Sequence, residues 1–470
     1  MDPRSTKVRP RGPGATLVIT SAVVLVATAC GARVSLPPPG TEATQDATVD
    51  ATDGLTTVDR SRHETGLLPD EGSIADGDTG VDSASSTDSA SSTDSASSTD
   101  SASGTDATSS TDGTSSDGGT VVIVSIAAGS FSTCLVLEGG GVTCFGRNAE
   151  GALGRGTFTM EAEKPAPVVG LPAPAVALAH RGGHACALLA DARVFCWGSG
   201  GAGLLGFPVV GDAAAAPPSA VPIEIVGAKG AVEVATSGQH DCVRLGDGSV
   251  RCWGSNAAGE VGDGTTTARV APTPASSLPA VPVQLALGAN FSCARLVDQR
   301  VACWGANGQG QIGQPAEVLS ATKPSLVFGV TDAVDLVASS EEVCVRRAAG
   351  EVACWGRPTI GSARFGATNV ASLFGAKRLA LGDILSAAAW PDGSVRQWGA
   401  VPYPSDGGLA FDTTGVPTVG LTDVVGLAAG WQHVCATRKD RTLWCWGDGL
   451  NCVIGDALGT KEFEPANISY

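Results

Sequence analysis

The chain has 470 residues and a net charge of −17. That charge excludes proteins that bind nucleic acid through an overall basic field. The charge is unevenly placed, because residues 31–120 carry −14 and residues 121–470 carry only −6. The strong acidity therefore belongs to one segment, and the remainder has the charge of an ordinary globular domain.

The first thirty residues have the pattern of an export signal. A basic start is followed by an apolar run from Ala15 to Ala29 that is too short to span a membrane comfortably. The run ends at Cys30 and resembles the lipobox at which bacterial lipoproteins are acylated, although Ala27 stands where that family prefers Leu. We expect residues 1–29 to be a signal peptide and Cys30 to carry a lipid. Cleavage at Ala29 without acylation and an uncleaved anchor are the alternatives, and all three place the rest of the chain outside the cytoplasm.

Residues 30–120 are rich in Ser, Thr, Asp and Gly, and include the near-perfect repeat "DSASSTDSASSTDSASSTDSASGTD" at 82–106. Such a composition buries too little apolar surface to offset the entropy of ordering the backbone. We predict a disordered acidic linker that tethers the following domain to the lipid anchor, which is the chain's only membrane contact in this interpretation.

From residue 121 onward the chain repeats a pattern of about fifty residues. Six segments have two cysteines ten positions apart, followed by Trp-Gly or Phe-Gly, as in "CVRLGDGSVRCWG" at 242–254. A seventh segment, 387–399, keeps Asp-Gly-Ser-Val and Trp-Gly but has Ala387 and Gln397 at the cysteine positions. The units follow one another at intervals of 43 to 56 residues, so that seven of them fill 121–470.

Each unit has the local signals of β-strands. Short runs of small and β-branched residues are bounded by Gly, Asp and Pro, with no helical periodicity. Cysteines at i and i+10 around a centred Gly-Asp-Gly turn lie opposite each other in an antiparallel hairpin, within reach of a disulfide. The predicted pairs are Cys134–Cys144, Cys186–Cys196, Cys242–Cys252, Cys293–Cys303, Cys344–Cys354 and Cys435–Cys445.

The pattern of cysteine loss supports these pairs. The unit that lacks one cysteine lacks both, as expected where a lone thiol is a liability in an oxidising compartment. Zinc binding would need Cys-x2–4-Cys spacing and four converging ligands, which these units do not have. Cys452 falls outside the pairs, and its state is left open.

The units resemble the repeats of the regulator of chromosome condensation family. The resemblance is clearest at 234–265, with its Gly-x-His, Asp-Gly-x-Val, Trp-Gly-x-Asn and Gly-x-x-Gly-x-Gly, and it covers 121–470. It implies an all-β seven-bladed β-propeller. Units five and six lack the usual Gly-x-x-Gly turn, so distortion is expected there. The final "PANISY" at 465–470 is expected to pair into the first blade and close the ring.

Several residues recur with the repeat and are therefore expected to be structural. His184, His240 and His433 precede a hairpin cysteine by two residues, and we expect them to form hydrogen bonds rather than catalyse or bind metal. The repeated tryptophans are expected to pack between blades; they are Trp197, Trp253, Trp304, Trp355, Trp398 and Trp446. The dinucleotide-like Gly308–Gly313 is interpreted as a propeller turn, because no helix follows it.

Four aromatic residues stand outside the repeat, and these are the candidates for ligand binding: Trp390, Tyr403, Trp431 and Trp444. No catalytic motif, metal site or cofactor site is predicted, and sialidase-type chemistry is disfavoured because only two tyrosines are present. The family resemblance also implies guanine-nucleotide exchange at chromatin, but an exported domain meets neither a GTPase nor DNA.

A rigid scaffold with variable loops favours recognition by a preformed surface. We therefore expect a monomeric module of the bacterial cell envelope that binds a protein at the cell surface, as an adhesion or inhibitory domain. The alternative is binding of carbohydrate or cell wall through aromatic platforms on one face. An enzyme or an exchange factor is disfavoured, and no nucleic-acid partner is expected.

Overall fold

The computed structural model describes residues 122–206, 216–359, 361–402, 409–418, 420–447 and 465–470. The predicted signal peptide, Cys30, the linker, Tyr403 and Cys452 lie outside the described residues.

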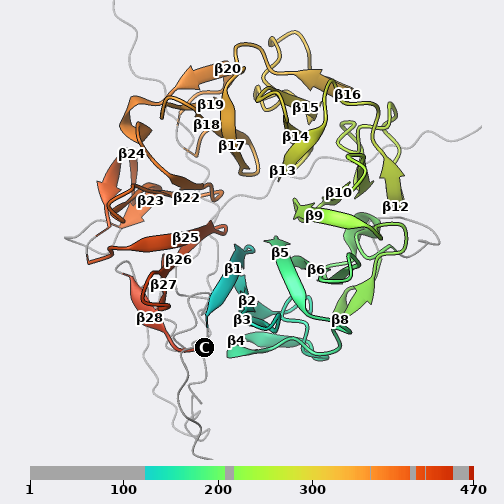
Figure 1. Ribbon diagram of the computed structural model, residues 1–470, viewed down its shortest axis with the longest axis vertical. Helices are drawn as coiled ribbons and strands as arrows, with labels where there is room; N and C mark the ends of the chain where they lie inside the picture. Colours follow the sequence, from blue (N-terminus) through green and yellow to red (C-terminus); the bar gives the residue numbers. More distant parts are fainter. Residues whose placement is uncertain (1–121, 207–215, 360, 403–408, 419, 448–464) are drawn as a thin grey trace, which may run out of the picture. The chain divides into compact units, whose positions relative to one another are not determined.

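Seven antiparallel sheets of four strands each stand like blades around a common axis (Figure 1). In every sheet the strands follow one another in chain order, and the first strand lies nearest the axis. The prediction of an all-β, seven-bladed propeller is confirmed. In the described part of the chain, no helix is long and apolar enough to span a membrane.

The first four blades contain β1 (Ile123–Ala128), β2 (Ser132–Leu137), β3 (Val142–Asn148) and β4 (Thr159–Pro167); β5 (Ala175–Arg181), β6 (His184–Leu189), β7 (Val194–Gly198) and β8 (Ser219–Glu224); β9 (Ala231–Thr236), β10 (His240–Leu245), β11 (Val250–Gly254) and β12 (Arg269–Pro274); and β13 (Pro282–Gly288), β14 (Phe291–Leu296), β15 (Val301–Ala306) and β16 (Ser320–Leu326). The last three contain β17 (Ala333–Ala338), β18 (Glu342–Arg347), β19 (Val352–Gly356) and β20 (Arg364–Asn369); β21 (Arg378–Ala380), β22 (Leu385–Ala389), β23 (Val395–Pro402) and β24 (Leu409–Pro417); and β25 (Val424–Ala429), β26 (His433–Arg438), β27 (Leu443–Gly447) and β28 (Ala466–Ile468). Two short 3-10 helices, η1 (Gly201–Gly203) and η3 (Ala371–Leu373), lie in the connections.

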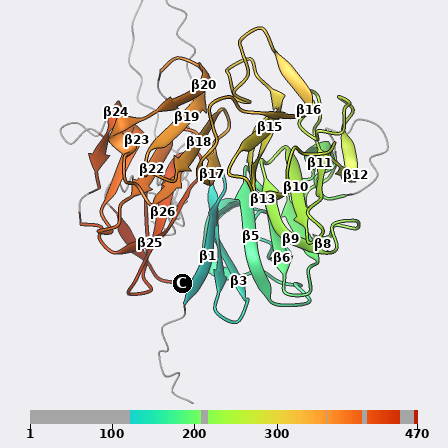
Figure 2. The ribbon, with the colours of Figure 1, turned by 45° about the horizontal axis from the view of Figure 1, so that its top comes forward.

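The up-and-down order of the strands gives the ring two different faces (Figure 2). One face, which we call the cleft face, carries the turns between the first and second strands and the loops between the third and fourth. The other, the entry face, carries the turns between the second and third strands and the loops that join one blade to the next. Backbone hydrogen bonds tie these entry-face segments together, for example from Ala333 N to Gln299 O at 2.9 Å. The described chain also begins here, since Glu138 N donates to Val122 O at 2.7 Å.

Six disulfides join the second and third strands of six blades, at the pairs expected from the spacing. The two residues of each pair are direct register partners, with Cα atoms 4.0 to 4.1 Å apart. Ala387 and Gln397 are register partners in the same way in the sixth blade. The repeat therefore places every pair at the same point of its hairpin.

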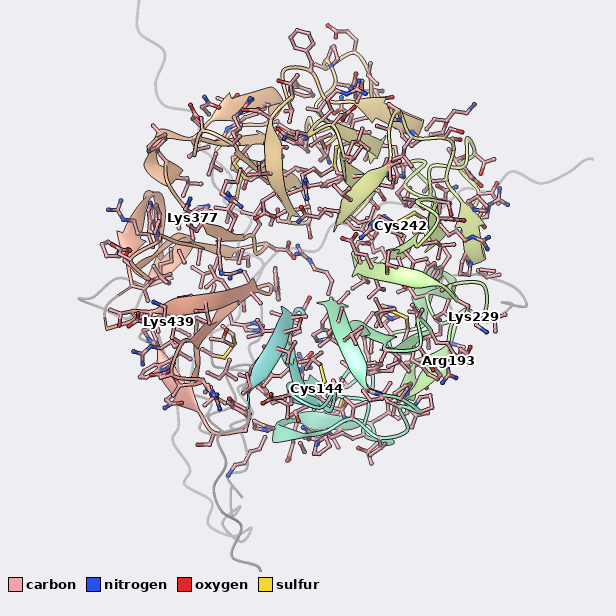
Figure 3. All side chains as sticks on the ribbon, viewed as in Figure 1. Cys144, Arg193, Lys229, Cys242, Lys377 and Lys439 are labelled. Carbon is pink, nitrogen blue, oxygen red and sulfur yellow. A yellow bond between two sulfur atoms is a disulfide. The ribbon has the colours of Figure 1, made fainter. Side chains whose placement is uncertain are left out.

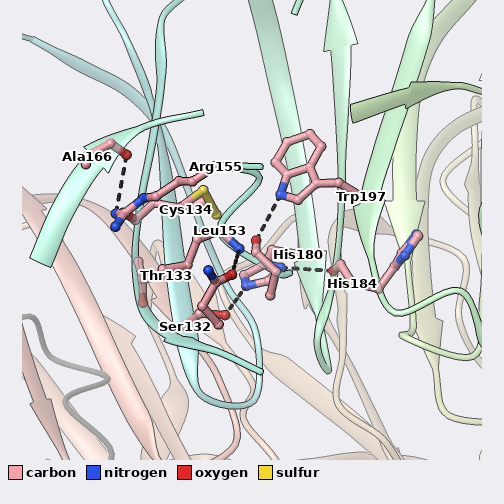
Figure 4. The surroundings of a disulfide bond; sticks show 12 residues. Ser132, Thr133, Cys134, Leu153, Arg155, Ala166, His180, His184 and Trp197 are labelled. Carbon is pink, nitrogen blue, oxygen red and sulfur yellow. Dashed lines mark hydrogen bonds between the residues drawn. A yellow bond between two sulfur atoms is a disulfide. The ribbon is translucent and has the colours of Figure 1, made fainter. Parts of the chain in front are cut away.

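Buried tryptophans bond the second, third, fourth and fifth blades to the blade before each of them. The Trp197 indole nitrogen donates to Ala152 O at 2.8 Å, at the Gly-x-x-Gly turn of the preceding blade (Figure 4). The Trp304 indole donates in the same way to Glu260 O at 2.8 Å. Trp253 and Trp355 make equivalent bonds to the preceding blade. This confirms the predicted packing role for the regular units.

The two tryptophans that follow the irregular units behave differently. Trp446 is buried, but its indole donates to the side-chain oxygen of Gln397, because the sixth blade has no Gly-x-x-Gly turn to offer a carbonyl. Trp398, which would meet the missing turn of the fifth blade, is only partly buried. The distortion expected in units five and six therefore consists of these altered tryptophan contacts and of a short first strand in the sixth blade, β21, which has only three residues.

The repeated histidines bond the second strand of one blade to that of the next. Nε2 of His184 lies 3.0 Å from Asp241 Oδ2, that of His240 lies 2.7 Å from Ser292 Oγ, and that of His433 lies 2.8 Å from Thr133 Oγ1. Burial lowers the pKa of His240 and of His433 to about 3, so both imidazoles are neutral at physiological pH. The hydrogen-bonding role predicted for these histidines is confirmed.

The ring closes in a way that the sequence analysis did not expect. The C-terminal strand β28 pairs with β27 as the fourth strand of the seventh blade, and the first blade is complete with its own β1 to β4. The expectation that it would pair into the first blade was wrong, because each repeat begins at an innermost strand and needs its own last segment. Closure comes instead from the bond between His433 and Thr133 and from packing of Ile468 with Leu135 and Phe145.

Candidate functional site

The cleft face is where the turns depart most from the repeat. Two places before the repeated histidine position, five units have a small residue, whereas unit six has Asp383 and unit seven has Trp431. One place earlier, every other unit has Gly or Ser, but unit two has Arg181. A long or charged side chain at these turns is not needed by the fold, since the other units are built without one.

An aromatic pair spans the contact between the seventh and first blades. The rings of Phe131 and Trp431 meet edge to face with centroids 5.1 Å apart, and the Arg147 guanidinium carbon lies 5.2 Å from the Phe131 centroid. Trp431 is 36% exposed, so part of its ring faces solvent. Aromatic and arginine side chains in this setting are typical anchors of binding surfaces.

Two cavities open on either side of the aromatic pair. The first, of about 350 Å³, is lined by Trp431 and Asp383 together with the turn and loop of the fifth blade, Ser339–Glu341 and Arg357–Thr359. The second, of about 310 Å³, is lined by Phe131 and Arg147 and by the turn of the second blade at Gly182 and Gly183. Each cavity is lined by one ring of the aromatic pair, and because the two rings are in contact we treat the cavities as one candidate site.

An ion pair across the ring joins Asp383, which lines the first cavity, to Arg181, which precedes Gly182 of the second. Arg181 of the second blade bonds to Asp383 of the sixth, and its guanidinium lies 3.4 Å from Ser340 Oγ of the fifth. Asp383 also accepts the Ser340 backbone N–H at 3.0 Å. Arg181 thus holds together turns that are more than 150 residues away from it along the chain.

Backbone bonds between neighbouring turns make this surface rigid. Ser130 N donates to Gly182 O at 2.8 Å, and Ile384 N donates to Trp431 O at 3.0 Å, in each case from one blade to the next. The side chains of the site therefore stand on a hydrogen-bonded ring of turns, and little ordering is needed when a ligand binds.

The structure separates the predicted binding aromatics. Trp431 lies in the candidate site, while Trp390 and Trp444 lie elsewhere and are stacked with Arg396 and Arg438, at 5.3 and 5.7 Å from guanidinium carbon to ring centroid. The indole of Trp390 also donates to Phe374 O at 3.0 Å on the entry face.

Sequence reasoning missed Phe131, Arg181 and Asp383, which complete the candidate site. The sequence contained a signal for them, because each is larger or more apolar than the residues that most other units have at the same turn position.

Two clusters of His, Cys and carboxylate groups lie on the hairpins, around Cys186 and around Cys344. In both clusters the sulfurs are joined in disulfides and offer no thiolate, so the donor set does not fit a zinc site. In the first cluster His184 and Asp241 bond to each other: burial opposes protonation of the imidazole, but the Asp241 carboxylate outweighs it and raises the His184 pKa.

Glu342 takes the histidine position in the fifth blade, next to the first cavity. Burial raises the pKa of its carboxyl to about 7, and the Arg364 guanidinium, 3.3 Å away, only partly opposes this. A carboxyl that titrates near neutral pH therefore lies beneath the turn that carries Glu341.

Comparison with known proteins agrees with this architecture. The family model of the regulator of chromosome condensation repeat matches residues 123–152, 283–311 and 424–451. The regulator of chromosome condensation of Drosophila melanogaster is 23% identical over 361 residues, which are 73% of this chain and 57% of that protein. The ultraviolet-B receptor UVR8 of Arabidopsis thaliana is 24% identical over 308 residues, which are 61% of this chain and 68% of that protein.

Among solved structures, Prp20p of Saccharomyces cerevisiae superimposes with a TM-score of 0.61 at 18% identity, covering 74% of this chain and 88% of that one. Each matched segment of the family model spans the first three strands of a blade. The chain is a seven-bladed β-propeller, and three of its blades match the regulator of chromosome condensation repeat.

Proposed function

We propose that this protein is a recognition module of the cell envelope, tethered through Cys30, that binds a protein partner with its cleft face. The observation that carries the proposal is the pair of cavities joined by Phe131 and Trp431, at the turns where the repeat is broken. A fold that needs only small residues at these turns has instead an exposed tryptophan, a stacked arginine and a cross-ring ion pair.

The chemistry of the site favours a protein ligand. Interface anchors are typically aromatic and arginine side chains in preformed pockets, surrounded by polar groups that give specificity. The cavities combine such anchors with both signs of charge, since Glu341 and Arg357 line the first and Glu150 and Arg147 line the second. The structure of Prp20p was described together with its binding to Gsp1p and histones; from that protein we extend to this chain only the binding of a protein partner.

The test compares variants of the full chain in capture from envelope extracts. Trp431→Ala should reduce capture of a stoichiometric partner at least tenfold, about 1.4 kcal/mol of binding energy, while leaving the fold intact. Phe365→Ala is the matched control, because it removes a comparably exposed ring from the outer strand β20. Equal capture by the two variants, or capture that depends on neither ring, would overturn the proposal.

Carbohydrate binding is the second candidate, favoured by the exposed Trp431 ring beside the hydroxyl of Ser340 and the carboxylate of Asp383. Sugar rings pack on aromatic faces and bond to such polar groups. Direct titration of cell-wall glycan fragments separates the two candidates. Heat of binding that is lost in Trp431→Ala would favour the glycan.

The tether is a separate part of the proposal. Mass spectrometry of the mature N-terminus should show a diacylated or triacylated Cys30. An unmodified N-terminus at Cys30 would instead indicate ordinary signal cleavage and a protein released from the membrane.

A further inference from the structure

The entry face carries apolar side chains that the core does not use. In four of the loops between blades, an exposed apolar residue is followed by a glycine with positive φ; the residue before it is buried in three of these loops and partly buried, as Val168, in the fourth. The exposed residues are Val169, Val226, Phe328 and Phe374, and the last three are 83%, 90% and 60% exposed. The glycine closes the turn, so the residue before it stands at the tip and points away from the blade.

A second set of apolar side chains lies nearer the axis on the same face. The first strands of several blades have a β-bulge at their second residue, and an exposed valine occupies it in four of them: Val124, Val176, Val232 and Val425. A bulge leaves one residue outside the ladder and re-aims its side chain. The apolar surface therefore extends from the tips of the loops to the start of the innermost strands.

Basic residues accompany two of the apolar tips, Val226 and Phe374. Lys229 follows Val226 by three residues, and Lys377 and Arg378 follow Phe374 by three and four. All three are exposed, and none forms an ion pair with a described residue. Figure 3 shows Lys229 and Lys377 on opposite sides of the ring.

The chain also enters the propeller at this face, where Val122 is bonded to the first hairpin. The segment that precedes it contains the predicted anchor at Cys30, so a lipid surface is already brought close to the molecule. Apolar tips with free lysines beside them match the boundary between acyl chains and anionic headgroups. A soluble partner would explain the valines and phenylalanines equally well, but not the entry of the tether at the same face.

We propose that the entry face docks on an anionic lipid bilayer, with Val226, Phe328 and Phe374 inserted at the headgroup level and the lysines on the phosphates. This docking goes beyond tethering and is independent of what the cleft face binds. It holds the ring flat on the membrane, with the cleft face directed outward.

Two native tryptophans report the orientation. Trp390 starts a turn on the entry face, and Trp431 lies on the cleft face. The full chain is mixed with vesicles of brominated phosphatidylcholine and phosphatidylglycerol, whose bromine atoms quench nearby indoles. Most of the quenching should be lost in Trp390→Phe and kept in Trp431→Phe. The opposite result would show the cleft face against the membrane and overturn the proposal.

A pair of substitutions that introduce negative charge tests the apolar tips themselves. Val226→Asp with Phe328→Asp should abolish the quenching of Trp390 while the N-terminal segment keeps the same amount of protein on the vesicles. The matched control is Phe158→Asp with Leu319→Asp, which alters two side chains that are 52% and 72% exposed in cleft-face loops. Docking is refuted if the Trp390 quenching survives in the Val226→Asp, Phe328→Asp variant, or if the wild type shows no quenching. If the wild type shows no quenching but self-associates as its concentration rises, the entry face binds a second copy of the chain instead.

Discussion

Replacing Gln397 by Leu should destabilise the ring, because the Gln side chain supplies the acceptor for the buried Trp446 indole. Leu has a similar volume and fills the same space, so the change removes a hydrogen bond without opening a cavity. Trp446 is 1% exposed, and water cannot easily replace the lost acceptor. A buried donor left unpaired costs about 1–3 kcal/mol, which is the expected loss in the free energy of unfolding.

Urea unfolding of the oxidised chain, followed by circular dichroism, measures this loss. The control is a double-mutant cycle with Trp446→Phe, which removes the donor. In that background Gln397→Leu should cost almost nothing. An equal cost in both backgrounds, or a cost below about 0.5 kcal/mol in the wild type, would show that the bond does not hold the sixth and seventh blades together.

The same bond predicts the outcome of restoring the missing disulfide. Ala387 and Gln397 are register partners, so Ala387→Cys with Gln397→Cys should close a seventh bridge. Closing a loop of about eleven residues is worth about 3 kcal/mol, but the variant also loses the acceptor for Trp446. The net gain should therefore stay below about 2 kcal/mol, and adding Trp446→Phe should recover the rest.

Three further predictions follow from the charges. Burial raises the pKa of Glu342 to about 7 from its ordinary 4.5. The contribution of this carboxyl to the free energy of unfolding is therefore full below pH 4.5 and is lost as the pH rises through 7. Glu342→Gln should remove this loss, and urea unfolding at pH 8 should show a stabilisation on the order of 3 kcal/mol. Burial lowers the pKa of His240 to about 3, below its unfolded value of 6.5. The contribution of this neutral imidazole to stability is therefore full above pH 6.5 and is lost as the pH falls toward 3. In His240→Gln the free energy of unfolding should fall less steeply with decreasing pH, by up to about 1.4 kcal/mol per pH unit. Arg181→Met should cost about 1–3 kcal/mol, with little further loss on adding Asp383→Asn, and additive costs in the double variant would mean that the two side chains are not coupled.

The fold was predictable because the residues that determine it recur at regular intervals along the chain. Cysteines, tryptophans and turn glycines return at intervals of about fifty residues, and a hairpin of fixed length puts each cysteine pair face to face. The position of β28 was not predictable in this way. The residues of 465–470 predict a strand, but they do not indicate which blade the strand joins. That depends on whether each repeat begins at the inner or the outer strand of a blade, and the spacing of the repeats is the same in both cases.

The candidate site was only partly predictable, for a different reason. Arg181 and Asp383 are 202 residues apart, and they meet only because the ring closes. A residue that does not recur in the other units is not for that reason a binding residue. Trp390 and Trp444 do not recur either, but they are stacked with arginines away from the cavities. What separates them from Trp431 is their place in the blade, because Trp431 lies in a turn between first and second strands on the cleft face, Trp390 starts a turn on the entry face, and Trp444 lies within β27.

The irregular units and the candidate site are connected through one interface. Between the fifth and sixth blades the buried tryptophan bond is missing, and the sixth blade has no disulfide. Asp383 spans this interface by accepting the Ser340 N–H, and Arg181 fixes it from across the ring. This contact, which lacks the tryptophan bond, is therefore held by Asp383, which lines the first cavity, and by Arg181, its ion-pair partner. A ligand that engages Asp383 acts on this contact, so binding at the cleft face and stability of the fifth and sixth blades should rise and fall together.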